Sequence, residues 1–216
     1  MKIIVIEGTD CSGKETQSKL IEEKLKKEGK KVLRISFPAY DSPTGKIIEG
    51  PYLGKSMNTY FDEGPTQVDP KVISMYYAAD RLYNLKDIDE NLDYIIFDRY
   101  VESNMAHQGS KIDNIEERKE LYNFINELEY KLLKLPKPDI TIFLHVPYEY
   151  VKKLKENRKQ FDEHEKDDKF SKKSIDTYLE LTNLYNWNKI ECIKDNNLRS
   201  IEDINEEIMN IIKDVD

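Results

Sequence analysis

The start of the chain constrains its fold more than any other stretch. An apolar run, Lys2–Glu7, leads into a glycine-bounded segment, Gly8–Lys14, and a helical pattern follows from Glu15. A strand that enters such a loop and then a helix is the setting of a phosphate-binding P-loop. Gly8 and Gly13 permit dihedral angles that let successive N–H groups converge on one anion. The following helix adds the positive end of its dipole.

The residues of this loop predict a nucleotide site. Lys14 is expected to reach the β- and γ-phosphates of the nucleotide. The common pattern is G-x-x-x-x-G-K-[ST], whose last hydroxyl ligates Mg²⁺, and Glu15 takes that place here. A tight turn with a surface lysine is the alternative interpretation. The candidate nucleotide-binding residues are Gly8, Thr9, Asp10, Cys11, Ser12, Gly13, Lys14, Glu15 and Thr16.

Composition narrows the class of protein. The chain has 216 residues, enough for a single α/β domain with a substantial core over 1–216. Its net charge of -8 argues against a general nucleic-acid binder, which would present a basic face. Cys11 and Cys192 are far apart in sequence, so no disulfide framework is expected. Without a membrane-span-length apolar run or a signal peptide pattern, we expect no membrane partner and a cytoplasmic location.

Apolar strand patterns alternate with helical patterns along the whole chain. We expect strands at Lys2–Glu7, Val32–Phe37, Asp93–Asp98, Asp139–Val146 and Lys189–Lys194. We expect helices at Thr16–Glu28, Asp69–Leu85, Ile115–Leu133, Pro147–Arg158, Ser174–Trp187 and Ser200–Val215, with a short one around Gly45–Gly50. This alternation predicts an α/β fold with a doubly wound, five-stranded parallel sheet and helices on both faces.

The expected helix Asp69–Leu85 differs from the others in its pattern. Asp69 is a good N-cap and Pro70 suits the first helical position. Its apolar residues cover nearly the whole circumference, so the helix should be buried on more than one side. It therefore either crosses the core or forms a subunit interface.

Ligands of such sheets bind at the carboxyl ends of the strands. This rule places the loop after Glu7, the turn at Phe37 and Pro38, the Asp98–Arg99 pair and the segment after Arg158 on one rim. Asp98 is a candidate metal ligand, or alternatively a simple turn residue at a strand end. Arg99 could hold a phosphate through its bidentate guanidinium, or alternatively form a surface ion pair.

Five motifs in a fixed order carry a family resemblance. They are EGTDCSGKETQ at 7–17, FPAY at 37–40, YAADR at 77–81, DRYVESN at 98–104 with AHQ at 106–108, and PDITIFLHV at 138–146. Together they resemble thymidylate kinases and span most of the chain. The resemblance implies a P-loop kinase fold with a lid at about 158–173. It also implies transfer of a phosphoryl group from ATP to dTMP with Mg²⁺, in dTTP biosynthesis.

The resemblance further implies roles for residues at matching positions. Asp10 would help hold the sugar of the acceptor and the catalytic arrangement. Lys14 would bridge the ATP phosphates, Arg99 would bind the dTMP phosphate, and Arg158 would open the lid. A homodimer is also implied, with the helix Asp69–Leu85 as the natural interface.

For the thymine base, the resemblance implies a stacking residue and a hydrogen-bonding residue. Tyr77 stands where the family places a stacking Phe, and Arg81 would hydrogen-bond the base; the alternatives are a core tyrosine and a helix-surface arginine. The full set of expected acceptor-binding residues is Phe37, Pro38, Tyr40, Tyr77, Arg81, Arg99, Ser103, Asn104, His107 and Gln108.

Four residues depart from the family pattern. Glu15 replaces the Mg²⁺-ligating hydroxyl, so Glu15, Thr16 and Asp98 are the candidate metal ligands. Ala39 stands where many members have an arginine, and His107 where an aromatic residue is usual. Cys11 stands where some members carry a loop arginine, which implies that the catalytic cation comes from the lid. The lid candidates are Arg158, first, and then Lys159, Lys166, Lys169, Lys172 and Lys173.

These departures leave two alternative functions open. His107 and Ala39 are compatible with a kinase of another pyrimidine nucleoside monophosphate. Glu15 and Ala39 are compatible with a nucleotide-binding regulatory paralogue that has little turnover.

Overall fold

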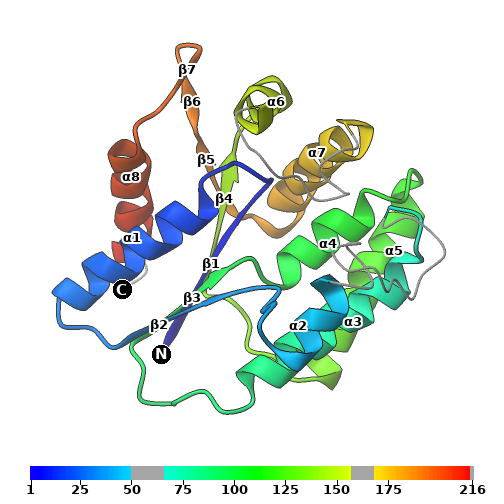
Figure 1. The fold of residues 1–216 in the computed structure, drawn as a ribbon, viewed down its shortest axis with the longest axis horizontal. Helices are drawn as coiled ribbons and strands as arrows, with labels where there is room; N and C mark the ends of the chain where they lie inside the picture. The colour runs from blue at the N-terminus through cyan, green and yellow to red at the C-terminus, as the bar shows by residue number, and fades with distance from the viewer. Residues whose placement is uncertain (50–65, 157–167, 215–216) are drawn as a thin grey trace.

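The fold is a central parallel sheet with helices on both faces, as the computed structural model in Figure 1 shows. The structure describes residues 1–49, 66–156 and 168–214. The sheet has strand order β2-β3-β1-β4-β5, and all its neighbouring strands run parallel. Its strands are β1 (Lys2–Gly8), β2 (Val32–Ser36), β3 (Tyr94–Asp98), β4 (Ile140–His145) and β5 (Asn188–Glu191). The predicted five-stranded parallel sheet is confirmed.

Two layers of helices cover the sheet. Helices α1 (Lys14–Lys27) and α8 (Ile201–Lys213) pack on one face. On the other face lie α4 (Val101–Gly109) and α7 (Asp168–Tyr185), with α3 (Pro70–Leu85) and α5 (Ile115–Asn126) against α4. The remaining helices are α2 (Pro43–Ile47), the π-helical η2 (Glu127–Leu132) and α6 (Tyr148–Glu156).

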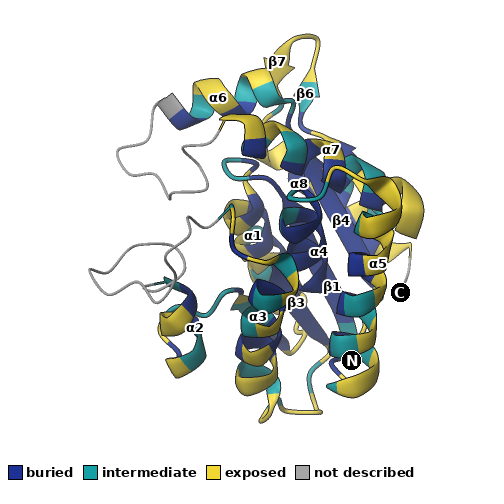
Figure 2. Ribbon diagram, turned by 90° about the vertical axis from the view of Figure 1, so that its right-hand side faces the viewer, coloured by how far each residue is buried: buried dark blue, intermediate teal, exposed yellow. Residues whose placement is uncertain are grey.

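Strand alternation divides the core into two clusters, one on each face of the sheet. Ile4 and Ile6 of β1 pack with residues of α1 and α8, whereas Ile3 and Val5 pack with residues of α4, α5 and α7. Figure 2 shows the buried strands enclosed by helices whose outer sides are exposed. A strand that is apolar on both faces is what a covered parallel sheet requires.

Two expected boundaries are wrong, and one expected helix changes its type along its length. The chain leaves the sheet after Glu191, so the predicted strand Lys189–Lys194 is divided between β5 and β6. The strands β6 (Ile193–Lys194) and β7 (Asn197–Leu198) form a separate antiparallel pair around a turn in which Asp195 and Asn196 have positive φ. Helix α7 begins at Asp168 rather than at Ser174, so residues 168–173 of the expected lid form its first turns. The expected helix Ile115–Leu133 changes from α-helix to π-helix at Glu127.

Helix α4 was not predicted at all. Its N-cap residue, Tyr100, makes no side-chain capping bond, so the usual local start signal is missing. The cap comes instead from Glu7 of β1, whose carboxylate accepts hydrogen bonds from the backbone N–H groups of Tyr100 and Ser103 at 2.9 and 3.1 Å. A cap supplied by a residue so distant in sequence leaves no local pattern.

Helix α3 begins as its sequence predicts, with the Asp69 carboxylate accepting from the backbone N–H groups of residues 71 and 72. Within this single chain, however, it is not buried all round. Met75, Leu82 and Tyr83 are 49, 41 and 40% exposed. The helix therefore lies on the protein surface with an uncovered apolar side. None of the described helices has the length and apolar character that crossing a membrane requires.

Candidate active site

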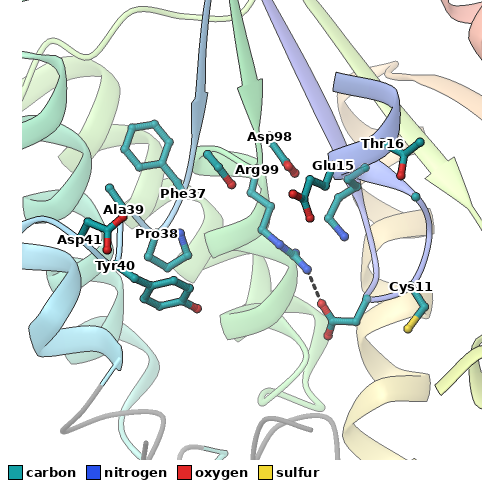
Figure 3. A pocket seen from close by; sticks show the side chains of 14 residues that line it. Cys11, Glu15, Thr16, Phe37, Pro38, Ala39, Tyr40, Asp41, Asp98 and Arg99 are labelled. Carbon is teal, nitrogen blue, oxygen red and sulfur yellow. Dashed lines mark hydrogen bonds and ion pairs between the residues drawn. The ribbon is translucent and has the colours of Figure 1, made fainter. Parts of the chain in front are cut away.

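A cavity of about 540 Å³ opens at the carboxyl ends of β1, β2 and β3. Its walls come from the P-loop (Gly8–Lys14), the start of α1, the turn after β2 and the end of β3. Figure 3 shows Arg99 between Tyr40 on one side and Thr16 on the other. The lining residues are Asp10, Cys11, Gly13, Lys14, Glu15, Thr16, Ser36, Phe37, Pro38, Ala39, Tyr40, Asp41, Asp98 and Arg99. Three of the four segments expected on the rim therefore surround one cavity. The fourth, which follows Arg158, begins outside the described residues.

Tight backbone geometry shapes the P-loop. A Cβ atom on Gly8 would lie 2.4 Å from Ser12 Oγ and 2.9 Å from the carbonyl oxygen of Leu144, so only glycine fits there. Gly13 has φ of 87° at the N-cap of α1, in the left-handed region that favours glycine. The two glycines of the motif are thus explained by close approach and by backbone conformation, respectively.

Lys14 lies folded along the P-loop and is only 7% exposed. Its Nζ donates a hydrogen bond of 2.6 Å to the carbonyl oxygen of Thr9. Burial, and next the positive charge of Arg99, lower the pKa of Lys14 to about 8. The predicted alternative of a surface lysine is wrong. A buried ammonium of this kind gains most from an anion that enters the loop.

Two hydroxyl groups of the P-loop are also suited to an anion. Thr9 Oγ1 and Ser12 Oγ are buried, and neither has a hydrogen-bonding partner in the part of the chain that the structure describes. Buried polar atoms usually have partners, because leaving them unpaired costs free energy. These hydroxyls favour a loop that binds a ligand over a loop that merely turns.

Arg99 connects the P-loop to the end of β3. Its Nη2 donates a 2.5 Å hydrogen bond to Asp10 Oδ1, which the dashed line from Arg99 in Figure 3 marks. Burial alone would raise the pKa of Asp10, but Arg99 and then Lys14 hold that pKa well below its usual range. The carboxylate is therefore charged at all physiological pH values. Arg99 thus forms an ion pair, and this pair lines the cavity. The binding of a phosphate by Arg99 stays a prediction.

His107 holds Arg99 from the opposite side. Its Nε2 is 3.1 Å from Arg99 Nη1, and since a guanidinium only donates, Nε2 must accept. The proton then sits on Nδ1, which lies 3.4 Å from Ser174 Oγ. The ring also stacks on Phe170, with centroids 6.3 Å apart. His107 is thus placed beside the guanidinium by two residues of α7 that sequence reasoning did not single out.

Behind Arg99 lies a buried polar cluster around Glu7. Besides capping α4, its Oε2 accepts hydrogen bonds from Ser103 Oγ at 2.6 Å and from Tyr178 Oη at 2.9 Å. Burial raises the pKa of Glu7, against the charge of Arg99. Ser103, expected to line the base pocket, is therefore bound to Glu7 here. A charged residue at the end of an apolar strand, such as Glu7, could have been recognised from the sequence as a candidate for the site. The sequence around Tyr178 contains no such indication.

Asp80 fixes the turn after β2. Its buried carboxylate accepts from the backbone N–H of Ala39 at 2.9 Å and from the hydroxyls of Ser42 and Thr44 at 2.9 and 2.8 Å. Gly45 allows this packing, since a Cβ there would lie 2.0 Å from the Ala39 carbonyl oxygen. Phe37 and Pro38, in the same turn, are joined by a cis peptide bond. Asp80 was not among the site residues predicted from the sequence, although it stands next to Arg81 in the YAADR motif.

Arg81 is buried, and its guanidinium donates hydrogen bonds to groups in the protein interior. At 2% exposure, its Nε and Nη2 donate to the two oxygens of buried Glu129 at 2.5 and 2.6 Å, and its Nη1 donates to the Tyr100 carbonyl oxygen at 3.3 Å. The alternative of a helix-surface arginine is wrong. The assignment of Arg81 to the base stays a prediction. Tyr77 lies one turn earlier on α3, half-buried against Ile48, Val68 and Ile73 with Tyr40.

Two amide side chains of α4 present unused acceptors. Asn104 donates through Nδ2 to the Ser74 carbonyl oxygen and to Glu129. Its Oδ1, and Gln108 Oε1, are buried without a hydrogen-bonding partner among residues 1–49, 66–156 and 168–214. Neither residue lines the 540 Å³ cavity, so their predicted place in a base pocket stays a prediction.

The three candidate metal ligands all line the cavity, but they do not form a complete set of ligands for a metal ion. These candidates are Glu15, Thr16 and Asp98. Glu15 pairs with Lys19 at 2.5 Å, and Asp98 pairs with Arg34 at 3.2 Å. Among the described residues, no three or more His, Cys, Asp or Glu side chains are grouped to hold a metal by themselves. These oxygens nevertheless suit Mg²⁺, which is usually bound by one or two carboxylates together with substrate phosphates.

Only some of the residues predicted to supply the lid cation lie among the described residues. Arg158, Lys159 and Lys166 lie outside the described residues. Lys169, Lys172 and Lys173 belong to α7, where Lys173 pairs with Asp113 on the loop before α5. A cation that sequence reasoning missed is Lys155 of α6, which is buried, donates to Ser171 Oγ at 3.1 Å and helps to lower the pKa of Asp10.

Comparison with known proteins gives a consistent result. The sequence model of the family described as "Thymidylate kinase" matches residues 6–208. The chain is 35% identical to a probable thymidylate kinase of Methanocaldococcus jannaschii, over 98% of this chain and 96% of that protein. It is 32% identical to a thymidylate kinase of Prochlorococcus marinus, over 98% of each. The solved thymidylate kinase of Candida albicans superposes with a TM-score of 0.73 at 26% identity, over 99% of this chain and 91% of that one.

Proposed function

The chain belongs to the thymidylate kinase family and phosphorylates dTMP to dTDP, and we propose that this ATP-dependent transfer takes place in the 540 Å³ cavity. The observation that carries the proposal is the position of two cations on one cavity. Lys14 lies in the P-loop, and Arg99 lies at the end of the neighbouring strand β3, where it pairs with Asp10 of the P-loop. Lys14 is suited to bind the phosphates of the donor, and Arg99 is suited to bind the phosphate of the acceptor.

On the donor side, the P-loop binds the triphosphate of ATP. Its backbone N–H groups and the N-terminus of α1 are directed at one anion. Lys14 exchanges its bond to the Thr9 carbonyl oxygen for the β- and γ-phosphate oxygens. The unpaired hydroxyls of Thr9 and Ser12 belong to the same loop and support this assignment.

On the acceptor side, Arg99 binds the phosphate of dTMP, with its orientation fixed by Asp10 and His107. The turn after β2, held by Asp80, forms the facing wall. Thymine presents one ring N–H between two carbonyl groups, so it needs both an acceptor and donors. The unpaired oxygens of Asn104 and Gln108 are acceptors of this kind, and this supports their predicted role at the base.

Asp98, with Glu15 and Thr16, is proposed to hold Mg²⁺ together with the phosphates. The bound ion would neutralise charge on the β- and γ-phosphates. Glu15 adds a negative charge beside these phosphates, and its pairing with Lys19 partly offsets that cost.

The transfer itself requires positioning more than covalent chemistry. An oxygen of the dTMP phosphate attacks the γ-phosphorus in line, the bond to the β,γ-bridging oxygen breaks, and ADP leaves. Lys14 and Arg99 keep the two phosphates in contact despite their like charges. Arg158, expected to approach from the lid, and buried Lys155 beside Asp10 are the candidates for further positive charge.

One coupled assay tests the proposed function. ADP formation is followed with dTMP, dUMP, UMP, CMP and AMP in parallel, with and without Mg²⁺. We expect the highest kcat/KM with dTMP and no turnover without the metal. A preference for UMP or CMP would point to the other pyrimidine kinase, and ATP binding without turnover to the regulatory paralogue. Neither alternative is supported by the three relatives described above, which are named thymidylate kinases or a probable thymidylate kinase.

We also propose a homodimer that buries the apolar side of α3. Met75, Leu82 and Tyr83 are exposed in the single chain and lie on this helix. Sedimentation should show a dimer that the double variant Met75→Glu/Leu82→Glu converts to a monomer. A wild-type monomer would refute the proposal. The cytoplasmic location stays a prediction from the sequence.

A further inference from the structure

The buried carboxylate of Glu7 joins three elements of the fold. Glu7 lies directly before Gly8, where the P-loop begins, and it is completely buried. Its Oε1 accepts hydrogen bonds from the backbone N–H groups of Tyr100 and Ser103 at 2.9 and 3.1 Å. Its Oε2 accepts from the hydroxyls of Ser103 and Tyr178 at 2.6 and 2.9 Å. One side chain therefore connects the start of the P-loop to the first turn of α4 and to α7.

The backbone of Arg99 adopts a conformation that needs support from its surroundings. Its φ of 68° lies in the left-handed region, which residues other than glycine rarely adopt. Such a conformation persists only where the contacts around it enforce it. The N–H of Arg99 donates to the Ile6 carbonyl oxygen at 3.1 Å, and the next N–H, that of Tyr100, donates to Glu7. Two consecutive residues of β1, Ile6 and Glu7, thus hold Arg99 in place.

The direction of the Arg99 side chain depends on this backbone conformation. Asp10 and His107 contact the guanidinium at 2.5 and 3.1 Å, whereas Glu7 fixes the backbone at the other end of the side chain. The same capping bonds fix the first turn of α4, the helix that carries His107. A displaced Glu7 carboxylate would therefore move both Arg99 and the residue that holds its guanidinium.

We propose that Glu7 is a positioning residue for the acceptor, which sets the place of Arg99 relative to the P-loop through its two capping bonds. Glu7 does not line the 540 Å³ cavity and acts through Arg99. The inference rests on the proposed binding of the acceptor phosphate by Arg99. The P-loop has internal contacts of its own, because Ser12 N and Lys14 Nζ both donate to the Thr9 carbonyl oxygen. Loss of the capping bonds should therefore impair the use of dTMP more than the binding of ATP.

Two substitutions of Glu7 separate the reach of the side chain from its charge. Glu7→Asp keeps the charge but is one methylene shorter, so its carboxylate no longer reaches both N–H groups. We expect its kcat/KM for dTMP to fall by about tenfold to a hundredfold, as small misplacements of catalytic groups do. Glu7→Gln keeps an oxygen at the original reach, and the hydroxyls of Ser103 and Tyr178 can turn to accept from its amide. It should stay within about threefold of wild type.

Two further measurements distinguish positioning from a general loss of stability. The Kd for ATP, measured by calorimetry without dTMP, should change by less than about threefold in both Glu7 variants. Ile190→Ala removes volume from a buried position on β5, outside the cavity lining, and serves as the destabilised control. It should lower the melting temperature and leave kcat/KM for dTMP unchanged.

A double variant tests whether Glu7 acts through Arg99. Arg99→Lys keeps a cation but lacks the bidentate guanidinium, so it should also lower kcat/KM for dTMP. If the two residues act as a unit, the loss in Glu7→Asp/Arg99→Lys is smaller than the product of the two single losses. Residues with independent roles would give the full product.

Unchanged kcat/KM for dTMP in Glu7→Asp, beside a clear loss in Arg99→Lys, would overturn this inference and leave the proposed function standing. Equal losses in ATP binding and in the use of dTMP would overturn it as well, as would a full product of losses in the double variant. Unchanged kcat/KM in Arg99→Lys would instead refute the proposed binding of the acceptor phosphate by Arg99, and this inference with it.

Discussion

The guanidinium of Arg99 and the carboxylate of Asp10 form a hydrogen-bonded ion pair of 2.5 Å that joins two loops of the sheet rim. Asp10 follows β1 and Arg99 follows β3, neighbouring parallel strands whose carboxyl ends meet at the cavity. His107 contacts the same guanidinium at 3.1 Å. Arg99 is therefore oriented before any phosphate arrives.

Replacing Asp10 should disturb this orientation. Asp10→Asn removes the charge that holds the guanidinium, and we expect kcat with dTMP to fall by about 10²-fold, as small misplacements of catalytic groups do. Steady-state kinetics with dTMP as the varied substrate measure the effect. Asp113→Asn removes an exposed carboxylate that pairs with Lys173 and should leave kcat unchanged. A normal kcat in Asp10→Asn would show that the pair does not position Arg99.

Lys14→Ala should abolish turnover. The buried ammonium is the P-loop group expected at the transferring phosphates, and loss of one such group costs at least about 10²–10³ in kcat. Turnover at saturating ATP and dTMP is the measurement. Lys26→Ala, at an exposed position further along the same helix, serves as the control. Near-normal rates in the Lys14 variant would rule out the P-loop assignment.

The pKa of Lys14, lowered to about 8, also predicts a pH dependence. Lysine is charged below its pKa, so the free enzyme holds an ammonium for ATP below about pH 8 and loses it above. The KM for ATP should therefore rise as the pH increases through this value. The pKa of Asp10 lies too low for that group to contribute in the same range. A KM for ATP that stays constant between about pH 7 and 9.5 would contradict this prediction.

The buried pair of Arg81 and Glu129 should dominate the stability of the α3–η2 contact. Arg81→Ala leaves the Glu129 carboxylate buried without its cation, and we expect the free energy of unfolding to fall by about 3–5 kcal/mol. Urea denaturation measures the change. Lys119→Ala breaks an exposed pair with Glu116 and should cost about 0–1 kcal/mol. Similar losses in the two variants would show that burial does not set the cost.

Glu15→Thr restores the hydroxyl of the common P-loop pattern. The substitution replaces a negatively charged candidate ligand with a neutral one, so we expect half-maximal activity at a higher Mg²⁺ concentration, by roughly threefold to tenfold. Activity is measured across Mg²⁺ concentrations at fixed ATP. Glu15→Ala is the control, because it removes the charge without adding a ligand. Equal Mg²⁺ requirements in Glu15→Thr and wild type would argue against metal contact at this position.

The sequence by itself determined the sheet and the loop that opens it. Period and composition identified the five strands of the sheet and most helices, and the spacing of Gly8, Gly13 and Lys14 identified the P-loop. These are local signals, carried by residues that are close along the chain. The same holds for the start of α3, where Asp69 and Pro70 form the cap.

Only the tertiary structure decided how the site behind the loop is built. Helix α4 is capped by Glu7 from another element, so no local pattern announced it. Arg81 proved to be buried because Glu129, 48 residues later, supplies its counter-charge. His107 faces Arg99 because α7 packs against α4. In each case the partner is distant in sequence, and the free energy of a contact between distant residues leaves no trace in the periodicity of either segment.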